Sequence, residues 1–265
     1  MKKVGIISVP YDENSSFEKG PAKAPNAILD YFANGSLNKG TENGHLLKIN
    51  ENVHILPTVN ICRPDEFFSQ LEASISDSLS NGYHLLSLGG DHSITFPIVS
   101  AYHKIYPNLT IVHFDAHSDL YHEFKGNRYS NACPFARIME SGLAARLHQY
   151  GIRTMTEHQW QQANKFNVDV NEMKDWPSAI LEIKGPIYIS IDIDAIDPAF
   201  APGVSHREPG GLTSRDIINF IHALPNNVVG IDIVEFNPDK DIDDITLNLS
   251  TKLVKESLGK LLESI

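Results

Sequence analysis

Two short acidic segments carry carboxylates at alternate positions, each directly after an apolar run. Asp115, His117 and Asp119 follow one run, and Asp192 and Asp194 lie among isoleucines at the end of another. In an extended chain, residues two apart point to the same side, so the polar groups of each segment would converge. A helix cap with solvated loop acids would account for one acid, but not for two acids flanking an imidazole. Carboxylates in apolar surroundings are costly unless cations pair with them, so the pattern indicates metal binding.

A third segment adds an imidazole to the same chemistry. The sequence from Gly89 to Ser93 follows an apolar run and precedes a helical pattern, and ligands in open α/β sheets gather at such strand ends. On its own, the segment favours a tight turn in which Asp91 or Ser93 caps the helix. Together with the other two segments, it adds His92 to four aspartates whose charges match two divalent cations. The sequence therefore predicts a dinuclear site with the ligands His92, Asp115, His117, Asp119, Asp192 and Asp194.

The ligand types indicate which ions and which reaction such a site supports. Oxygen-rich coordination without thiolate favours a hard, octahedral ion, with manganese ahead of zinc. Two metals about 3.5–4 Å apart lower the pKa of a bridging water towards neutrality and supply hydroxide, so the predicted reaction is hydrolysis. A further strand end carries Asp232, which fits a structural hydrogen-bond acceptor, and Glu235, which is the better substrate contact. Asp197, before Pro198, is typical of a turn.

The composition limits the partners and the compartment of the chain. With 33 acidic and 22 basic residues, the formal net charge is -11, which would repel nucleic acid and favours a neutral or cationic substrate. No apolar run approaches the ~20 residues of a membrane-spanning helix, so no membrane partner is expected. Cys62 and Cys133 fit neither a disulfide framework nor a Cys-pair zinc site, and we expect buried or incidental thiols. The N-terminus lacks a hydrophobic signal core, so we expect a cytoplasmic protein.

The candidate site residues must be positioned by the elements that the apolar patterns predict. Short apolar runs alternate with helical patterns, which is typical of an α/β protein with a parallel sheet covered on both faces. The predicted strands are Val4–Val9, Val53–Leu56, His84–Leu88, Leu109–Phe114, Leu147–Ile152, Ile187–Ile193 and Val228–Val234. The predicted helices are Pro25–Asn34, Pro64–Asn81, Ile94–Ile105, Cys133–Ser141, Glu157–Phe166, Ser214–Leu224 and Leu247–Leu262. Two of these helices have clear starts, at Asn131 or Ala132 before Pro134 and at Thr213-Ser214. No repeat, linker or composition break interrupts the pattern, so we expect residues 1–265 to form a single domain.

The same segments resemble the arginase/agmatinase family of ureohydrolases, and the resemblance covers nearly the whole chain. The matching segments are Lys19–Pro21 with Ala24–Pro25, Gly89–Ser93, Asp115–Asp119, Ser190–Pro198 and Glu208–Leu212. The plant-type arginase branch, whose members can overlap arginase and agmatinase activities, is most similar over Asn127–Glu140, Gly151–Thr154 and Ala199–His206. The resemblance implies a three-layer α/β/α fold with a mostly parallel central sheet, a trimeric or hexameric assembly, and two manganese ions. It also implies cleavage of a guanidino compound to urea and an amine, with agmatine and arginine as the first candidate substrates.

Carried over position by position, the resemblance gives the candidate residues their roles. It assigns one or other metal to His92, Asp115, Asp119 and Asp192, with His117 and Asp194 completing the pair. It makes Glu235 the carboxylate that orients the substrate guanidinium, whose planar fork of N–H donors suits a bidentate carboxylate. It also places Ser130 and His206 among the substrate-binding residues.

One position departs from the family pattern. Where the family has a histidine that relays protons or assists the leaving amine, this chain has Asn131. An amide cannot act as a general acid near neutral pH, and losing such a group costs about 10²–10⁴-fold in rate. His122 is nearby in the sequence and is a candidate replacement, with a solvated loop residue as an equally favoured alternative. The departure puts ordinary arginase activity in question, but not the metal site.

Two alternatives to guanidine hydrolysis stay open from the sequence. A hydrolase of formimidoylglutamate or of an N-hydroxyguanidine would act on a better leaving group, and it could dispense with the missing histidine. A catalytically weakened family member would bind metal and ligand as a sensor or assembly subunit, and Asn131 favours this alternative. The complete set of six ligands argues against it, because a carboxylate cluster kept without catalysis would still need metals to offset its repulsion.

Overall fold

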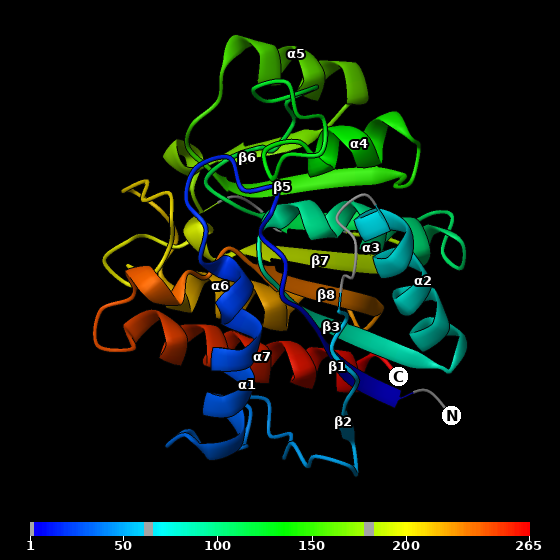
Figure 1. Cartoon of the computed structure of the whole chain (residues 1–265), viewed down its shortest axis with the longest axis vertical. Helices are drawn as coiled ribbons and strands as arrows, with labels where there is room; N and C mark the ends of the chain where they lie inside the picture. The colour runs from blue at the N-terminus through cyan, green and yellow to red at the C-terminus, as the bar shows by residue number, and fades with distance from the viewer. Residues whose placement is uncertain (1–2, 61–65, 178–182) are drawn as a thin grey trace.

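An eight-stranded sheet runs through the centre of the structure, a computed structural model that describes residues 3–60, 66–177 and 183–265 (Figure 1). Its strands are β1 (Lys3–Val9), β2 (Val53–Ile55), β3 (Tyr83–Gly89), β4 (Thr110–Phe114), β5 (Arg146–Ile152), β6 (Asp169–Glu172), β7 (Ile187–Asp192) and β8 (Val228–Val234). Their order is β2-β1-β3-β8-β7-β4-β5-β6, and all neighbouring pairs are parallel. The predicted parallel α/β sheet is confirmed.

Helices cover both faces of this sheet and complete three layers. One face carries α1 (Ala24–Asn34), α6 (Ser214–Ala223) and α7 (Ile245–Glu263). The other carries α2 (Phe67–Ser80), α3 (Thr95–His103), α4 (Pro134–Glu140) and α5 (Glu157–Phe166). The central strands β3, β4, β7 and β8 are buried almost throughout, which explains their largely apolar sequences. The expected three-layer α/β/α fold is confirmed.

The observed elements differ from the predicted ones at a few points. The strand β6 was not predicted, because three of its four residues are polar and all four are only partly buried at the edge of the sheet. The predicted helix start at Pro64 lies outside the described residues, and α2 is seen from Phe67. The helix α4 begins with Cys133 as its N-cap, one or two residues later than expected. The predicted start at Thr213 is confirmed, since its side chain accepts a hydrogen bond from the backbone of α6.

The two cysteines and the membrane prediction can also be compared with the structure. Cys133 is a buried free thiol, as expected, whereas Cys62 lies outside the described residues. None of the helices in the described ranges is both long and apolar enough to cross a bilayer.

The order of the strands decides which loops meet. The strands β3, β8, β7 and β4 are consecutive neighbours, so the segments that follow them lie side by side at one edge of the sheet. These four segments begin with Gly90, Glu235, Ile193 and Asp115. Ligands of open α/β folds bind outside the carboxyl ends of the strands, so this edge is the place to examine for a site.

Candidate functional site

His92 follows β3 and lies among three carboxylates. Its Nδ1 atom is 3.3 Å from Asp115 Oδ2, 3.1 Å from Asp119 Oδ2 and 3.2 Å from Asp192 Oδ2. All four residues are buried. The acids therefore gather around one nitrogen in a region from which solvent is largely excluded.

A hydrogen-bonded relay sets the tautomer of His92. Its Nε2 atom is 2.9 Å from Ser190 Oγ, and that hydroxyl donates at 2.7 Å to Asp232 Oδ1. Because the hydroxyl proton goes to Asp232, the hydroxyl oxygen accepts the proton on Nε2 and leaves Nδ1 with a lone pair. This buried Nδ1 has no hydrogen-bond partner among the described residues. A lone pair that faces three carboxylate oxygens is repulsive unless a cation lies between them, so these residues fit a metal ion.

A second group of ligands lies beside the first and shares Asp115 with it. His117 Nδ1 is 3.3 Å from Asp115 Oδ1 and 3.1 Å from Asp194 Oδ2. The ligand atoms of these three residues lie within 4.8 Å of one another. Asp115 thus directs one oxygen towards His92 and the other towards His117, as a carboxylate between two cations would. The structure brings together all six residues that were predicted as ligands.

The backbone that carries these ligands is not the extended chain that the alternation assumed. The strand β4 ends at Phe114, and Asp119 has a left-handed backbone with φ of 50°. Asp194 lies in the 3-10 turn η5 (Ile193–Ala195), where its amide donates at 2.7 Å to Asp192 Oδ1. The side chains converge as predicted, but turns and local hydrogen bonds direct them rather than the pleat of a strand.

Burial and neighbouring charges shift the pKa values of several residues in the cluster. Burial and the charge of Asp115 raise the pKa of Asp119 to about 7. Burial and the charges of Asp194 and Asp115 raise the pKa of Asp192 well above its usual range. Burial alone would lower the pKa of His117, but the same two charges raise it to about 12. Without cations this cluster retains protons, which divalent ions would displace.

Sequence reasoning missed His113, although the same alternation contains it. Its Nδ1 atom is 2.9 Å from the amide nitrogen of Gln149, which can only donate, so the ring proton lies on Nε2. That Nε2 donates at 2.9 Å to Asp115 Oδ2. Burial lowers the pKa of His113 to about 4, which keeps the ring neutral. Since both ring nitrogens are occupied, His113 orients Asp115 rather than binding a metal.

Glu235 follows β8, and only one of its carboxylate oxygens is occupied. The Oε1 atom accepts hydrogen bonds from the His92 amide at 2.9 Å and from Asn131 Nδ2 at 2.8 Å. The Oε2 atom has no partner among the described residues. Burial and the charge of Asp91 raise the pKa of Glu235 to about 8. A cationic ligand next to Oε2 would stabilise the ionised form.

Asn131 is fixed at both ends of its side-chain amide. The Ser16 amide donates at 2.9 Å to Asn131 Oδ1. Because a backbone N–H can only donate, the oxygen must face Ser16 and Nδ2 must face Glu235. Asn131 therefore holds one oxygen of the Glu235 carboxylate in place.

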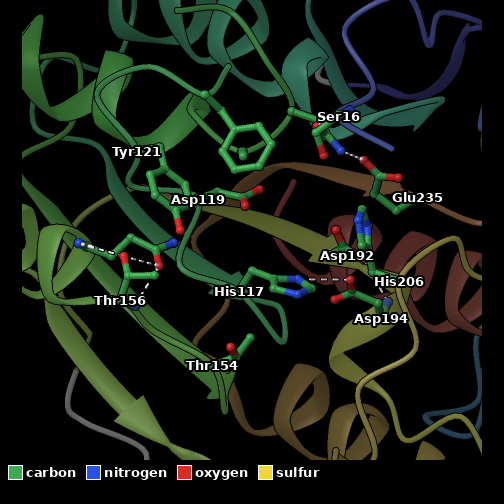
Figure 2. Close-up of a pocket in the computed structure, with 14 residues that line it drawn as sticks. Ser16, His117, Asp119, Tyr121, Thr154, Thr156, Asp192, Asp194, His206 and Glu235 are labelled. Carbon is green, nitrogen blue, oxygen red and sulfur yellow. Dashed lines mark hydrogen bonds and ion pairs between the residues drawn. The ribbon is translucent and has the colours of Figure 1, made fainter. Parts of the chain in front are cut away.

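Glu235, Asn131 and four of the metal-ligand residues, His117, Asp119, Asp192 and Asp194, line one cavity (Figure 2). Figure 2 shows Glu235 and Ser16 on one side, Tyr121 and Thr156 on the opposite side, and metal-ligand residues between them. His206, predicted to bind substrate, also lines the cavity, and its ring centroid is 5.6 Å from that of His117.

Two other predicted residues lie outside this cavity. The Ser130 hydroxyl is 3.2 Å from Asn131 Oδ1 and accepts from the Ala132 amide at 3.3 Å. The His122 ring places Nδ1 3.3 Å from Arg137 Nη2, and its carbonyl oxygen accepts from Arg137 Nη1 at 2.8 Å. His122 therefore faces Arg137, and the structure does not support it as a replacement for the missing histidine.

Three acids near the site have the structural roles expected of them. Asp91 accepts a hydrogen bond from the Ser93 amide at the helix start. Asp197 accepts from three backbone amides in a turn. Asp232 accepts from three hydroxyl groups, including that of Ser190.

Comparisons with known proteins agree with this arrangement. The family described as "Arginase family" matches residues 2–259. "Arginase 1, mitochondrial" of Arabidopsis thaliana is 44% identical in sequence to this chain, and the aligned region covers 97% of this chain and 80% of the relative. "Agmatinase" of Bacillus subtilis is 32% identical in sequence, and the aligned region covers 74% of this chain and 70% of the relative. The solved structure of arginase from Medicago truncatula has a TM-score of 0.90 at 40% identity, covering 98% of this chain and 87% of that chain.

Proposed function

Because this chain belongs to the arginase family and is a ureohydrolase, we propose that it cleaves a small cationic guanidino compound to urea and an amine at a dinuclear manganese site. The observation that carries the proposal is the open oxygen of Glu235, which lies in one cavity with the metal-ligand cluster. Arginine is the first candidate substrate, since relatives that match most of this chain are named arginases. Agmatine is the second, by similarity to proteins named agmatinases.

The six ligand side chains would hold the ions, with Asp115 between them. Bound there, the two ions would supply a water activated for nucleophilic attack near neutral pH. His113 and Ser190 hold two of the ligands in place. Ser190 hydrogen-bonds Nε2 of His92, which leaves Nδ1 towards the acids, and His113 hydrogen-bonds Oδ2 of Asp115. Oxygen ligands outnumber nitrogen ligands, which is why manganese is the proposed metal.

Glu235 would orient the guanidinium through Oε2 alone. Its Oε1 already accepts two hydrogen bonds, so the bidentate contact expected from the sequence is not available. A single charge-assisted hydrogen bond still directs the guanidinium carbon towards the ligand cluster, because the carboxylate cannot rotate while Asn131 and the His92 amide hold it. Asn131 has no acidic proton near neutral pH, so its contribution is to hold Glu235.

The direct test is product analysis of the purified protein reconstituted with manganese. The panel contains arginine, agmatine, N-hydroxyarginine and formimidoylglutamate, and the measured products are urea, hydroxyurea and formamide. We expect urea from arginine. Formamide or hydroxyurea without urea would move the assignment to an amidine or N-hydroxyguanidine hydrolase. No product from any compound, with ligand binding retained, would indicate a catalytically weakened family member.

A further inference from the structure

The buried carboxylate of Asp91 contacts two different segments of the chain. Asp91 is fully buried and follows β3. Its Oδ1 atom accepts hydrogen bonds from the amide and the hydroxyl of Ser93, in the 3-10 turn η3 (His92–Ile94). Its Oδ2 atom accepts from the Asn14 amide at 3.0 Å and from the Ser15 hydroxyl at 3.4 Å. The first pair is enough to cap the turn, so the second pair has a separate effect, which is to hold the loop that follows β1.

The same loop is paired with Asn131 on its other side. The Asn131 amide donates at 3.0 Å to the Asn14 carbonyl oxygen. The Ser16 amide donates at 2.9 Å to Asn131 Oδ1, and Asn131 Nδ2 donates to Glu235 Oε1. A continuous path of hydrogen bonds therefore leads from Asp91, through the backbone of this loop, to the carboxylate that would orient the guanidinium.

The groups around Asp91 explain why a charged side chain is buried at this position. Four described groups hydrogen-bond its oxygens, and all four are N–H or O–H donors. Two of them are backbone amides, which can only donate. A carboxylate accepts from all four, whereas the side chain of an asparagine would turn an NH₂ group towards a donor. Since burying a charge is costly unless such donors meet it, the four contacts fix the loop relative to the end of β3.

We propose that Asp91 is a positioning residue for the guanidinium site, because it holds the loop that orients Asn131 and, through Asn131, Glu235. The proposal rests on the proposed function and adds a residue that acts without touching the substrate. Releasing the loop from Asp91 should have the same effect as removing the Asn131 side chain. The effect should be equal for arginine and agmatine, because both present a guanidinium to Glu235.

The variant Asp91→Asn tests this role with a side chain of the same shape. The amide oxygen should stay with Ser93, whose hydroxyl contact is shorter than that of Ser15, so the NH₂ group would face the Asn14 amide. We expect kcat/KM for arginine to fall about tenfold, as in Asn131→Ala. The KM should rise, because a turning carboxylate holds the guanidinium less firmly. A smaller folded fraction would instead lower kcat and leave KM unchanged, and that result overturns the proposal.

The double variant of Asp91→Asn and Asn131→Ala separates positioning from other effects of the lost charge. A path through Asn131 predicts about a tenfold loss in the double variant, like that in either single variant. Independent or purely electrostatic contributions would multiply to about 100-fold, which overturns the proposal. Elemental analysis of manganese should give the content of the unmodified protein. A loss of manganese that matches the loss of activity would place the effect at His92 and would also overturn the proposal.

Two further variants serve as the control and as a milder form of the test. Asp12→Asn is the matched control, because Asp12 Oδ2 accepts from the amides of Gly20 and Ala22 in the same loop. An equal loss in this control would show that the loop as a whole matters, and would overturn the role of Asp91. Ser15→Ala removes one donor to Asp91 and keeps the carboxylate, so it replaces Asp91→Asn if that variant does not fold. We expect about a threefold loss of kcat/KM in Ser15→Ala, and no loss in this folded variant overturns the proposal.

Calorimetric binding of arginine to the manganese-loaded protein gives a readout that does not need turnover. The affinity should fall equally in Asp91→Asn, in Asn131→Ala and in the double variant. If the unmodified protein binds arginine and releases no urea, the proposed function is contradicted, and these affinities still decide the role of Asp91. Unchanged affinity in Asp91→Asn overturns that role and leaves ureohydrolysis intact. Failure of the unmodified protein to bind any guanidino compound overturns both.

Discussion

The contact between Asn131 and Glu235 predicts that the two residues act as one unit. Asn131 Nδ2 donates at 2.8 Å to Glu235 Oε1, and both residues are buried. The His92 amide is the other donor to that oxygen. Asn131→Ala leaves one donor of two, so the carboxylate can turn away from the orientation in which Oε2 meets the guanidinium. Glu235→Gln removes the charge that the guanidinium meets.

Hydrogen bonds to charged groups set the magnitude of each change. A hydrogen bond to a charged group contributes about 1.5–3 kcal/mol. We expect kcat/KM to fall about 100-fold in Glu235→Gln, near the upper part of that range. Asn131→Ala acts only by letting the Glu235 carboxylate rotate, and we expect kcat/KM to fall about tenfold, which corresponds to about 1.4 kcal/mol. Since the smaller effect passes through Glu235, the double variant should lose about 100-fold, like Glu235→Gln alone.

Steady-state kinetics on arginine with all three variants measures this coupling. Independent contributions would multiply to about a 1000-fold loss in the double variant, and that result would refute the reasoning. Asn127→Ala is the matched control, because this exposed asparagine belongs to the same loop and hydrogen-bonds Asn14 rather than Glu235. A loss in the control as large as in Asn131→Ala would show that the loop as a whole, and not the amide, matters.

Four further outcomes follow from the site and its surroundings. Asp115→Ala should abolish turnover and lower the metal content below two ions per chain, because Asp115 faces both histidine ligands; a normal metal content by elemental analysis would contradict this. Because the pKa of Asp119 is raised to about 7, manganese binding should release protons, and the affinity for manganese should fall between pH 8 and pH 6. Calorimetry in buffers of different ionisation enthalpy measures both the proton release and the affinity. His122→Ala should leave kcat essentially unchanged, since the His122 ring faces Arg137 outside the cavity. A large fall in kcat would instead support His122 as the proton-relay residue. The pKa of Glu42 is lowered to about 2 by Arg215, so its contribution to stability is present at pH 7 and is lost as the pH falls from about 4.5 to about 2; Glu42→Gln should lower the Tm at pH 7, by a difference that shrinks on acidification.

The ligand set could be predicted from the sequence because its signals are local. Buried strands, the acids that follow them and the alternation of side chains each depend on a few consecutive residues. Asp115 and Asp192 were therefore identified from their own segments. His113 has the same parity as Asp115 and could have been found by the same rule. The strand β6 could not, since a four-residue edge strand with a single apolar residue, Val170, has no apolar pattern.

The tertiary structure decided which strand ends meet and where the loop side chains point. The order β3-β8-β7-β4 places the His92 amide against Glu235, 143 residues further along the chain. Asn131 faces Glu235 because the amide of Ser16, 115 residues away, fixes its oxygen. His122 faces Arg137 instead of the cavity. Side-chain direction along a strand follows from the backbone itself, whereas in a loop it follows from partners that only the folded chain brings near.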